Sequence, residues 1–390
     1  MGEHPDMNET LDMNETPKDP FAAAASFNAG VYGTGVRPVT AERLAEAVRL
    51  LLRAAGSDAA EAGVVADHLV EANLRGHDSH GVGMLAMYMP AIAAGLLRPN
   101  QHATVLGRSG PFLSVGGGSG YGQAIAREAM DLAIAQARQE GLVALSLRDT
   151  HHIGRVGSYG EQCSDAGLVA LAFVNVVTRP AVAPHDGTRP RLGTNPICIA
   201  VPATPANPAL VLDFATSAVA VGKCRVAMNK GREMASGLLL DADGEATLDP
   251  GVMFREPSGA LLPLGGTAGG HKGFGLALMC DVLAGALASA MPGTPSHQDS
   301  GRVMNNLFAI VFDPARGGNA HWAADLDDLL AYVRDTPAAP GAEAVQLPGE
   351  PERRTRAQRL ADGIPLDGAT LAMLESLGRE RGVEVAGLLA

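Results

Sequence analysis

The sequence predicts a mixed α/β protein. Short apolar runs rich in branched residues, typical of strands buried on both faces, occur at 112–115, 143–147, 168–176, 197–201, 210–214 and 307–312. Segments of helical periodicity, at 122–140 and 273–291, lie between some of these runs and complete a layered α/β arrangement. No GxGxxG motif follows a strand, so an ordinary Rossmann fold is not expected.

The first and last parts of the chain predict helices rather than strands. Apolar residues recur at helical spacing from Thr40 to about Leu97, with a break at Gly56-Ser57-Asp58 where Ser57 or Asp58 is the expected N-cap. A Pro- and Gly-rich linker at 337–351 precedes a second helical stretch. The predicted division is a disordered tail at 1–36, a helical domain at 37–110, a nucleotide-binding α/β domain at 111–318, and C-terminal helices at 319–390 that pack on the first helical domain.

Composition excludes several classes of protein. A net charge of −12 without a basic run argues against nucleic-acid binding. The four cysteines have no CxxC spacing and lie among apolar residues, which predicts buried reduced thiols, no metal site and a cytoplasmic location. The longest apolar run carries Asp281 near its middle, which favours a buried helix over a membrane span.

The segment Arg75-Gly-His-Asp-Ser-His-Gly81 is the densest polar interruption of the apolar helical region. It joins two helical stretches, and His80 is the candidate acid/base because an unperturbed imidazole titrates near neutrality. The alternative is that His77, Asp78 and Ser79 cap the second helix.

Further polar clusters lie at expected strand ends, at His151–Arg155, Gly193–Pro196 and Asp213–Ser217. Of the two adjacent histidines in the first cluster, we expect only one to face a ligand. A glycine-rich stretch precedes His271 and Lys272, which are expected to open a long helix and place a cation at its positive end, as an anion site requires. The alternative is a flexible loop with a solvated lysine.

Five ordered motifs resemble one family. They are Gly76–Met84, His151–Arg155, Gly193–Pro196, Leu212–Ser217 and His271–Gly273, and together they resemble the malate/L-lactate/L-sulfolactate dehydrogenase family, which lacks a Rossmann domain. The form Ser-His-Gly-Val-Gly-Met-Leu and the later Leu347-Pro-Gly-Glu350 are most similar to its hydroxycarboxylate dehydrogenase B branch.

The resemblance implies a homodimeric oxidoreductase with a mixed, largely antiparallel sheet for the nucleotide and a helical domain for the acid/base. The implied reaction interconverts a small 2-oxo acid and a 2-hydroxy acid with NAD or NADP. His80 is then the proton donor or acceptor, with Ser79 and Asp213 as a relay around it. Thr194 and Asn195 are implied substrate contacts. The implied cofactor contacts are His80, His152, Gly154, Arg155, Val156, Val211, Leu212, Asp213, Phe214, Ala215, His271, Lys272, Gly273 and Asn305.

One departure from the family pattern bears on the substrate. Many members carry arginine where this chain has Met84, and a bidentate arginine fork is hard to replace. We therefore hypothesise an oxo acid with a larger apolar group, such as an aryl-pyruvate. A relay between adjacent Ser79 and His80 also requires a non-helical junction, which Gly76 and Gly81 permit.

Three alternative functions stay open from the sequence. One is a serine hydrolase using Ser79, His80 and Asp213, although no GxSxG elbow is present. The second is an imine reductase of the same family that acts on cyclic amino acids. The third is a catalytically inert nucleotide-binding oligomer.

Overall fold

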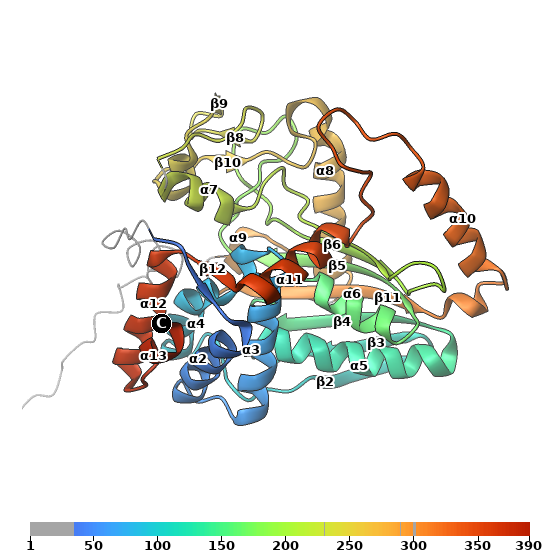
Figure 1. Cartoon of the computed structure of the whole chain (residues 1–390), viewed down its shortest axis with the longest axis horizontal. Helices are drawn as coiled ribbons and strands as arrows, with labels where there is room; N and C mark the ends of the chain where they lie inside the picture. Colours follow the sequence, from blue (N-terminus) through green and yellow to red (C-terminus); the bar gives the residue numbers. More distant parts are fainter. Residues whose placement is uncertain (1–34, 230, 289, 299–301) are drawn as a thin grey trace, which may run out of the picture.

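A central sheet organises the computed structural model, which describes residues 35–229, 231–288, 290–298 and 302–390 (Figure 1). The sheet has seven strands in the order β2-β3-β4-β11-β5-β6-β7. Their bounds are β2 Thr104–Ser109, β3 Phe112–Gly116, β4 Leu142–Thr150, β5 Val169–Val177, β6 Ile197–Val201, β7 Leu210–Phe214 and β11 Met304–Phe312.

Neighbouring strands of this sheet run antiparallel, except that β3 and β4 are parallel. The predicted mixed, largely antiparallel α/β fold is therefore confirmed, and each of the six apolar runs forms a strand. Strand β2 was not foreseen, because all its residues are exposed and the division at residue 110 left them with the helical segment. An edge strand with no buried face has no apolar alternation to reveal it.

A helical layer lies beside the sheet. It contains α2 (Ala41–Ala54), α3 (Ala59–Leu74) and α4 (Leu85–Ala93), and Asp58 caps α3 by accepting a hydrogen bond from the Glu61 amide at 2.8 Å, as predicted. The C-terminal helices α12 (Gly368–Arg381) and α13 (Ala386–Leu389) share one buried apolar cluster with α2 and α3. Strand β1 (Arg37–Val39) pairs with β12 (Ile364–Leu366), which also joins the two ends of the described chain.

Not all of 319–390 follows these helices. Helix α10 (Trp322–Arg334) lies at the opposite end of the molecule (Figure 1), where Asn207 donates a hydrogen bond to Asp327 at 2.6 Å. Helix α11 (Glu350–Asp362) runs along α3, to which Arg356 is joined through Glu71 at 2.7 Å. The prediction that residues 319–390 pack on the first helical layer therefore holds only for the residues that follow α10.

Helices α5 (Gly122–Glu140) and α6 (Gly157–Asp165) pack on the sheet, and α5 has the predicted bounds. Its C-terminus is closed by Gly141, whose φ of 92° is readily available to glycine. The shared core is built from small and branched aliphatic side chains, in keeping with the low aromatic content.

A smaller lobe follows β7. It holds the sheet β10-β8-β9, the helices α7 and α8, and its own apolar cluster. Its elements are α7 Val221–Asn229, β8 Leu239–Leu240, β9 Ala246–Thr247, η3 Pro250–Phe254, β10 Ala260–Leu261 and α8 Gly266–Cys280. The π-helix η4 (Asp281–Ala286) continues from α8 onto the large sheet, and α9 (Pro295–Gln298) follows it. The 3-10 turn η5 (Pro314–Arg316) comes after β11, beside the end of α5.

The bounds of α8 correct one prediction. The helix begins at Gly266, so His271 and Lys272 lie in its second turn as exposed side chains and do not open it. Close packing against backbone requires glycine at two positions of this helix: a Cβ on Gly266 would lie 2.6 Å from the Gly237 carbonyl oxygen, and one on Gly273 would lie 2.3 Å from the Leu264 carbonyl oxygen. Low helix propensity is overridden by packing here.

Other sequence expectations concern single groups. Asp281 is buried, and its carboxylate accepts hydrogen bonds from Asn175 at 3.1 Å, Asn195 at 2.7 Å and the Gly293 amide at 2.9 Å.

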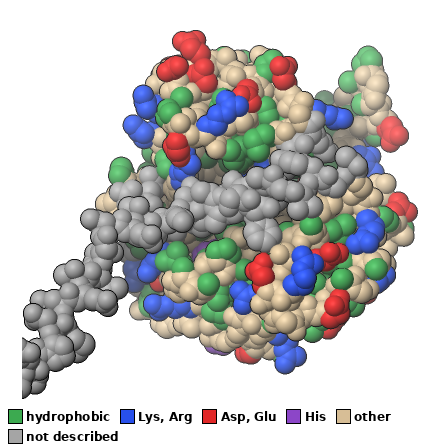
Figure 2. All heavy atoms as spheres, turned by 90° about the vertical axis from the view of Figure 1, so that its left-hand side faces the viewer, with side chains coloured by type: hydrophobic (Ala, Val, Ile, Leu, Met, Phe, Trp, Pro, Cys, Tyr) green, Lys and Arg blue, Asp and Glu red, His purple; other side chains and the backbone are tan. Residues whose placement is uncertain are grey.

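The four cysteines are buried and unbridged, as predicted. Within the described ranges no helix is long and apolar enough to span a membrane. Acidic and basic side chains are interspersed on the face drawn in Figure 2. The predicted tail at 1–36 lies almost entirely outside the described residues.

Candidate active site

The junction between α3 and α4 is built from two 3-10 turns, η1 (Asp78–His80) and η2 (Val82–Met84). Asn73 anchors it: Nδ2 donates to Asp78 at 2.7 Å, and Oδ1 accepts from the Val82 amide at 2.9 Å. Gly81 lies so close that a Cβ there would be 2.1 Å from Oδ1 of Asn73. Neither turn has a side-chain cap, so the capping alternative for this segment is not supported.

The non-helical backbone brings two adjacent side chains together. Oγ of Ser79 lies 3.0 Å from Nδ1 of His80, the geometry that a regular helix would forbid. His80 is half-buried, and the protein around its ring lowers its pKa to about 4, with smaller contributions from His77 and Arg155. His80 is therefore a neutral imidazole at pH 7, with one nitrogen committed to Ser79.

His152 lies beside His80. The two rings stack with centroids 5.6 Å apart and an interplanar angle of 15°. The hydroxyl of Tyr88 lies 2.8 Å from Nδ1 of His152 and accepts a hydrogen bond from Gln123 at 2.5 Å. In the tautomer in which the phenol donates its proton to Nδ1, Nε2 of His152 carries the ring proton.

Two further histidines, His68 and His151, lie near His80 and His152, and these four residues form the histidine cluster. Nε2 of His68 accepts a hydrogen bond from the Arg155 amide at 3.0 Å, and burial lowers the pKa of His68 to about 3. Gly154, with φ of 73°, fits against this ring, and a Cβ there would lie 2.3 Å from Nε2. His151 is 2% exposed with Nδ1 unpaired, and burial lowers its pKa to about 4.

Arg155 is buried against two carboxylates. It donates to both oxygens of Glu161, at 3.0 and 2.9 Å, and its Nε lies 3.7 Å from Asp213. Glu161 also pairs with Arg75 at 3.0 Å. The Arg155 guanidinium is thus committed to carboxylates within the protein, and its contact with a cofactor stays a prediction.

Asp213 closes this network from the end of β7. Its Oδ2 accepts a hydrogen bond from the Gly157 amide at 2.7 Å, at the N-terminus of α6. Burial raises the pKa of Asp213, while Arg155 opposes the shift. Across the described residues no hydrogen bond or ion pair joins Asp213 to Ser79 or His80, so the relay implied for it is not direct.

Several other residues that were expected to contact the cofactor or the substrate make contacts within the protein. Oδ1 of Asn305 accepts from the Ile153 amide at 2.8 Å, which fixes the backbone after the two histidines. Asn195 is fully buried and bonded to Val176, Ala277 and Asp281, which leaves its side chain no free polar atom for a substrate. Val156 and Val211 belong to the core of the sheet. Thr194, Leu212, Phe214 and Ala215 retain accessible surface.

The end of β7 leads back to Ser79 through the small lobe. The carbonyl of Thr216 accepts from the Leu264 amide at 2.9 Å, immediately before α8. The following helix α7 begins against the junction, and a Cβ on Gly222 would lie 2.8 Å from that of Ser79. Continuous contacts therefore connect the histidine cluster, the starts of α7 and α8, and the last residues of β7.

These residues fit a nicotinamide cofactor. Lowered pKa values keep His80, His151 and His152 neutral, so they do not repel the cationic ring of an oxidised nicotinamide. Helix α8 begins at Gly265 without a side-chain cap, and His271 and Lys272 are exposed one turn later. That end suits a phosphate group.

Sequence reasoning missed His68, Tyr88, Gln123 and Gly222. Each lies singly in a helical or loop segment, and a lone polar residue or glycine there carries no signal of its spatial partner. Only the pairing of α3, α4 and α5 with the strand-end loop brings the first three to His151–Arg155.

Comparison with known proteins gives consistent matches. The model of the malate/L-lactate dehydrogenase family matches residues 39–375. Hydroxycarboxylate dehydrogenase B of Escherichia coli (strain K12) is 39% identical over 348 residues, covering 88% of this chain and 94% of that protein. L-lactate dehydrogenase of Cupriavidus necator is 40% identical over 323 residues, covering 82% and 91%. A solved E. coli structure, provisionally described as a malate/lactate dehydrogenase, superposes with a TM-score of 0.86 at 38% identity, covering 90% of this chain and 97% of that one.

Proposed function

Because the chain belongs to the malate/L-lactate dehydrogenase family, we propose that it is a NAD- or NADP-dependent 2-hydroxy acid dehydrogenase with His80 as its acid/base. The observation that carries the proposal is the contact between Ser79 and a neutral, half-buried His80. A neutral imidazole that keeps some accessible surface is the base that oxidation of a hydroxyl group needs.

His80 acts through its two nitrogens. In the tautomer that donates Nδ1–H to Ser79, the Nε2 lone pair accepts the proton from the C2 hydroxyl of the hydroxy acid. The imidazolium that forms keeps its Nδ1 proton on Oγ of Ser79, which limits the cost of creating a charge in a buried position. In the reverse direction, the same nitrogen returns the proton to the C2 oxygen.

His152 is a positioned donor next to this base. With Nδ1 held by Tyr88, its Nε2–H is free to donate to an oxygen of the substrate. Met84 is half-buried against the helical cluster and brings no charge to the junction. We therefore propose that apolar contact, rather than an arginine at this position, selects a 2-oxo acid with an apolar side chain.

The cofactor supplies the hydride acceptor when bound. In the proposal, the backbone of Gly154, Leu212, Phe214 and Ala215, with the start of α8, holds it near His80. Lys272 is an exposed cation near that helix end, and the exposed His271 lies beside it. Preference between NAD and NADP and the homodimer implied by the family belong to the proposal as well.

The test is a comparison of His80→Gln with His102→Gln, followed by nicotinamide absorbance. NADH and NADPH are each supplied with phenylpyruvate, pyruvate, oxaloacetate and 2-oxoglutarate. We expect kcat to fall by about 10²–10⁴ in His80→Gln. His102, which is 72% exposed, serves as the control, and its variant should match the wild type.

Three results would redirect the proposal. No turnover of any oxo acid with intact cofactor binding would leave an inert nucleotide-binding oligomer, or an imine reductase if a cyclic imine acid is reduced. Labelling of Ser79 by a fluorophosphonate would point to a hydrolase instead. Equal activity of His80→Gln and wild type would remove His80 from the acid/base role.

A further inference from the structure

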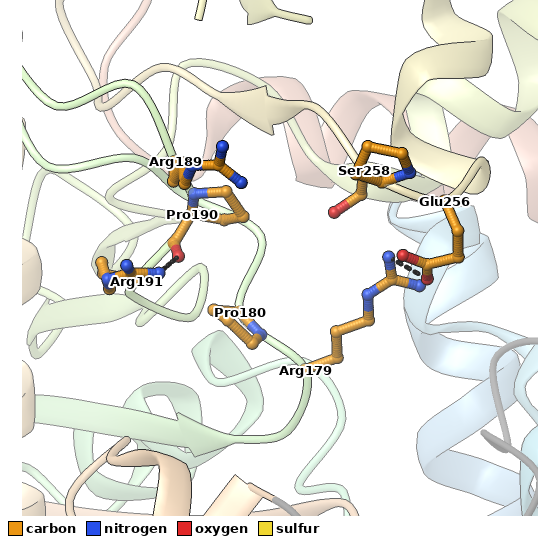
Figure 3. A pocket seen from close by; sticks show the side chains of 8 residues that line it. Arg179, Pro180, Arg189, Pro190, Arg191, Glu256 and Ser258 are labelled. Atoms are coloured by element: carbon orange, nitrogen blue, oxygen red, sulfur yellow. Dashed lines mark hydrogen bonds and ion pairs between the residues drawn. The ribbon is translucent and has the colours of Figure 1, made fainter. Parts of the chain in front are cut away.

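A recess in the small lobe gathers arginines. Its volume is about 260 Å³, and its lining includes Arg179, Arg189, Arg191, Glu256 and Ser258 together with three prolines. Figure 3 shows the arginine and glutamate side chains around the opening. None of these residues belongs to the candidate active site.

The lining of the recess is basic, although the chain as a whole is acidic. The protein has 42 acidic and 30 basic residues, whereas this lining has three guanidinium groups and one carboxylate. That carboxylate, on Glu256, pairs with Arg179 at 2.5 Å. Arg191 donates to the Pro190 carbonyl at 3.0 Å, and in the described parts of the chain neither Arg189 nor Arg191 takes part in an ion pair. Arg189 and Arg191 therefore bring two positive charges to the lining without an ion-pair partner among the described residues.

The walls of the recess are held by backbone pairing. The amide of Val182 donates to Leu192 at 2.9 Å, and the amide of Arg191 donates to Val182 at 2.9 Å. The amide of Leu261 donates to Ala181 at 2.8 Å, which ties the segment that carries Glu256 and Ser258 to the arginine-bearing loop. Val182, Leu192 and Leu261 are also buried in the apolar cluster of the lobe. The arginines thus project from a rigid frame, which lowers the entropy cost of binding.

We propose that this recess binds a small dicarboxylate, at a site separate from that of His80. A dianion matches the two uncompensated guanidinium groups, and planar carboxylates match the fork of donors on each. Ser258 adds a hydroxyl donor or acceptor at the rim. The side chain of Glu256 is 75% exposed, so it is able to rotate away from Arg179 when a ligand carboxylate competes for that guanidinium.

The first experiment measures succinate binding to the full chain by calorimetry at low and physiological salt, with acetate as the monoanion comparison. The double variant Arg189→Gln/Arg191→Gln should weaken succinate binding by at least about tenfold, because charge-assisted hydrogen bonds are lost. The matched control, Arg53→Gln/Arg108→Gln, removes the same charge from exposed positions elsewhere and should leave binding unchanged. Acetate should bind more weakly than succinate to the wild type.

A second variant tests whether the Glu256 carboxylate competes with a ligand carboxylate for Arg179. Glu256→Gln removes the carboxylate that competes with a ligand for Arg179, so succinate should bind more tightly than to the wild type. Succinate affinity that is equal in the arginine double variant and its control would overturn the proposal, as would acetate binding as well as succinate.

Enzyme assays separate this site from the proposed reaction. The arginine double variant should keep its kcat and KM for the oxo acid within about twofold, whereas His80→Gln should lose turnover and still bind succinate. A KM that rises in parallel with the loss of succinate binding would show that the recess is part of the reaction site, against the proposal. Failure of the dehydrogenase assay would leave the binding result intact.

Discussion

The hydroxyl of Tyr88 on α4 lies 2.8 Å from Nδ1 of His152, in the loop after β4. This contact joins the helical layer to the sheet at the candidate active site. It also orients His152, whose ring stacks on that of His80. The ring of one histidine is therefore held by an element far away in the sequence.

Replacing Tyr88 with Phe should destabilise the protein by about 1–3 kcal/mol, because the Gln123 amide and His152 lose a buried partner. Dehydrogenase turnover should fall at least about tenfold, since His152 is no longer held. Urea denaturation and steady-state kinetics measure the two effects. Tyr121→Phe is the matched control, because Tyr121 is also buried and no hydrogen bond joins its hydroxyl to His152 or Gln123 among the described residues; equal losses in both variants would argue against the positioning role of Tyr88.

Gly81→Ala should distort the junction. The new Cβ would lie 2.1 Å from Oδ1 of Asn73, so the side chain that holds Asp78 and Val82 must move. We expect a loss of about 1–3 kcal/mol in unfolding free energy and a lower kcat, as Ser79 and His80 lose their alignment. Gly83→Ala, two residues on, meets no atom within 4 Å and should stay close to the wild type. A fully active Gly81→Ala protein would contradict the proposed alignment.

Glu161→Gln should be among the most damaging single changes near the site. It removes the carboxylate that accepts both Arg155 hydrogen bonds and pairs with Arg75, and it leaves a cation that is 2% exposed with Asp213 only. Breaking a buried pair costs about 3–5 kcal/mol. Glu128→Gln affects an exposed pair with His102 and should cost less than about 1 kcal/mol. Similar thermal midpoints for the two variants would contradict this ranking.

Stability should decline as the medium is acidified from about pH 6.5. The pKa of buried His151 is lowered to about 4, so between 6.5 and 4 the unfolded chain takes up a proton that the folded chain does not. The folded state therefore loses about 1.4 kcal/mol per pH unit for such a group, and the loss levels off below the folded pKa. His68 and His80 shift in the same direction.

Urea unfolding at pH 7.5, 6 and 5 measures this dependence. A His151→Phe variant should show a flatter decline than the wild type. His102, whose pKa is raised by Glu128, is the control with the opposite sign, and its replacement should not flatten the curve. A stability that is constant over this range would contradict the neutral histidine cluster.

The sequence by itself determined the family, the α/β class, six of the sheet strands and the segment that holds Ser79 and His80. These features are local: buried strands need continuous apolar runs, and the motifs keep their residues within a few positions of one another. The expected helix start at His271 and Lys272 was wrong by more than one turn, because α8 begins at Gly266.

The tertiary structure decided which polar groups meet. Arg155, an expected cofactor contact, and Asn195, an expected substrate contact, are each buried and paired within the protein. Tyr88, Gln123 and His68 enter the site from three helices, although no motif names them. Charge and hydrogen-bonding partners are assigned by proximity in space, and a buried polar group takes the partner that folding places within about 3 Å of it.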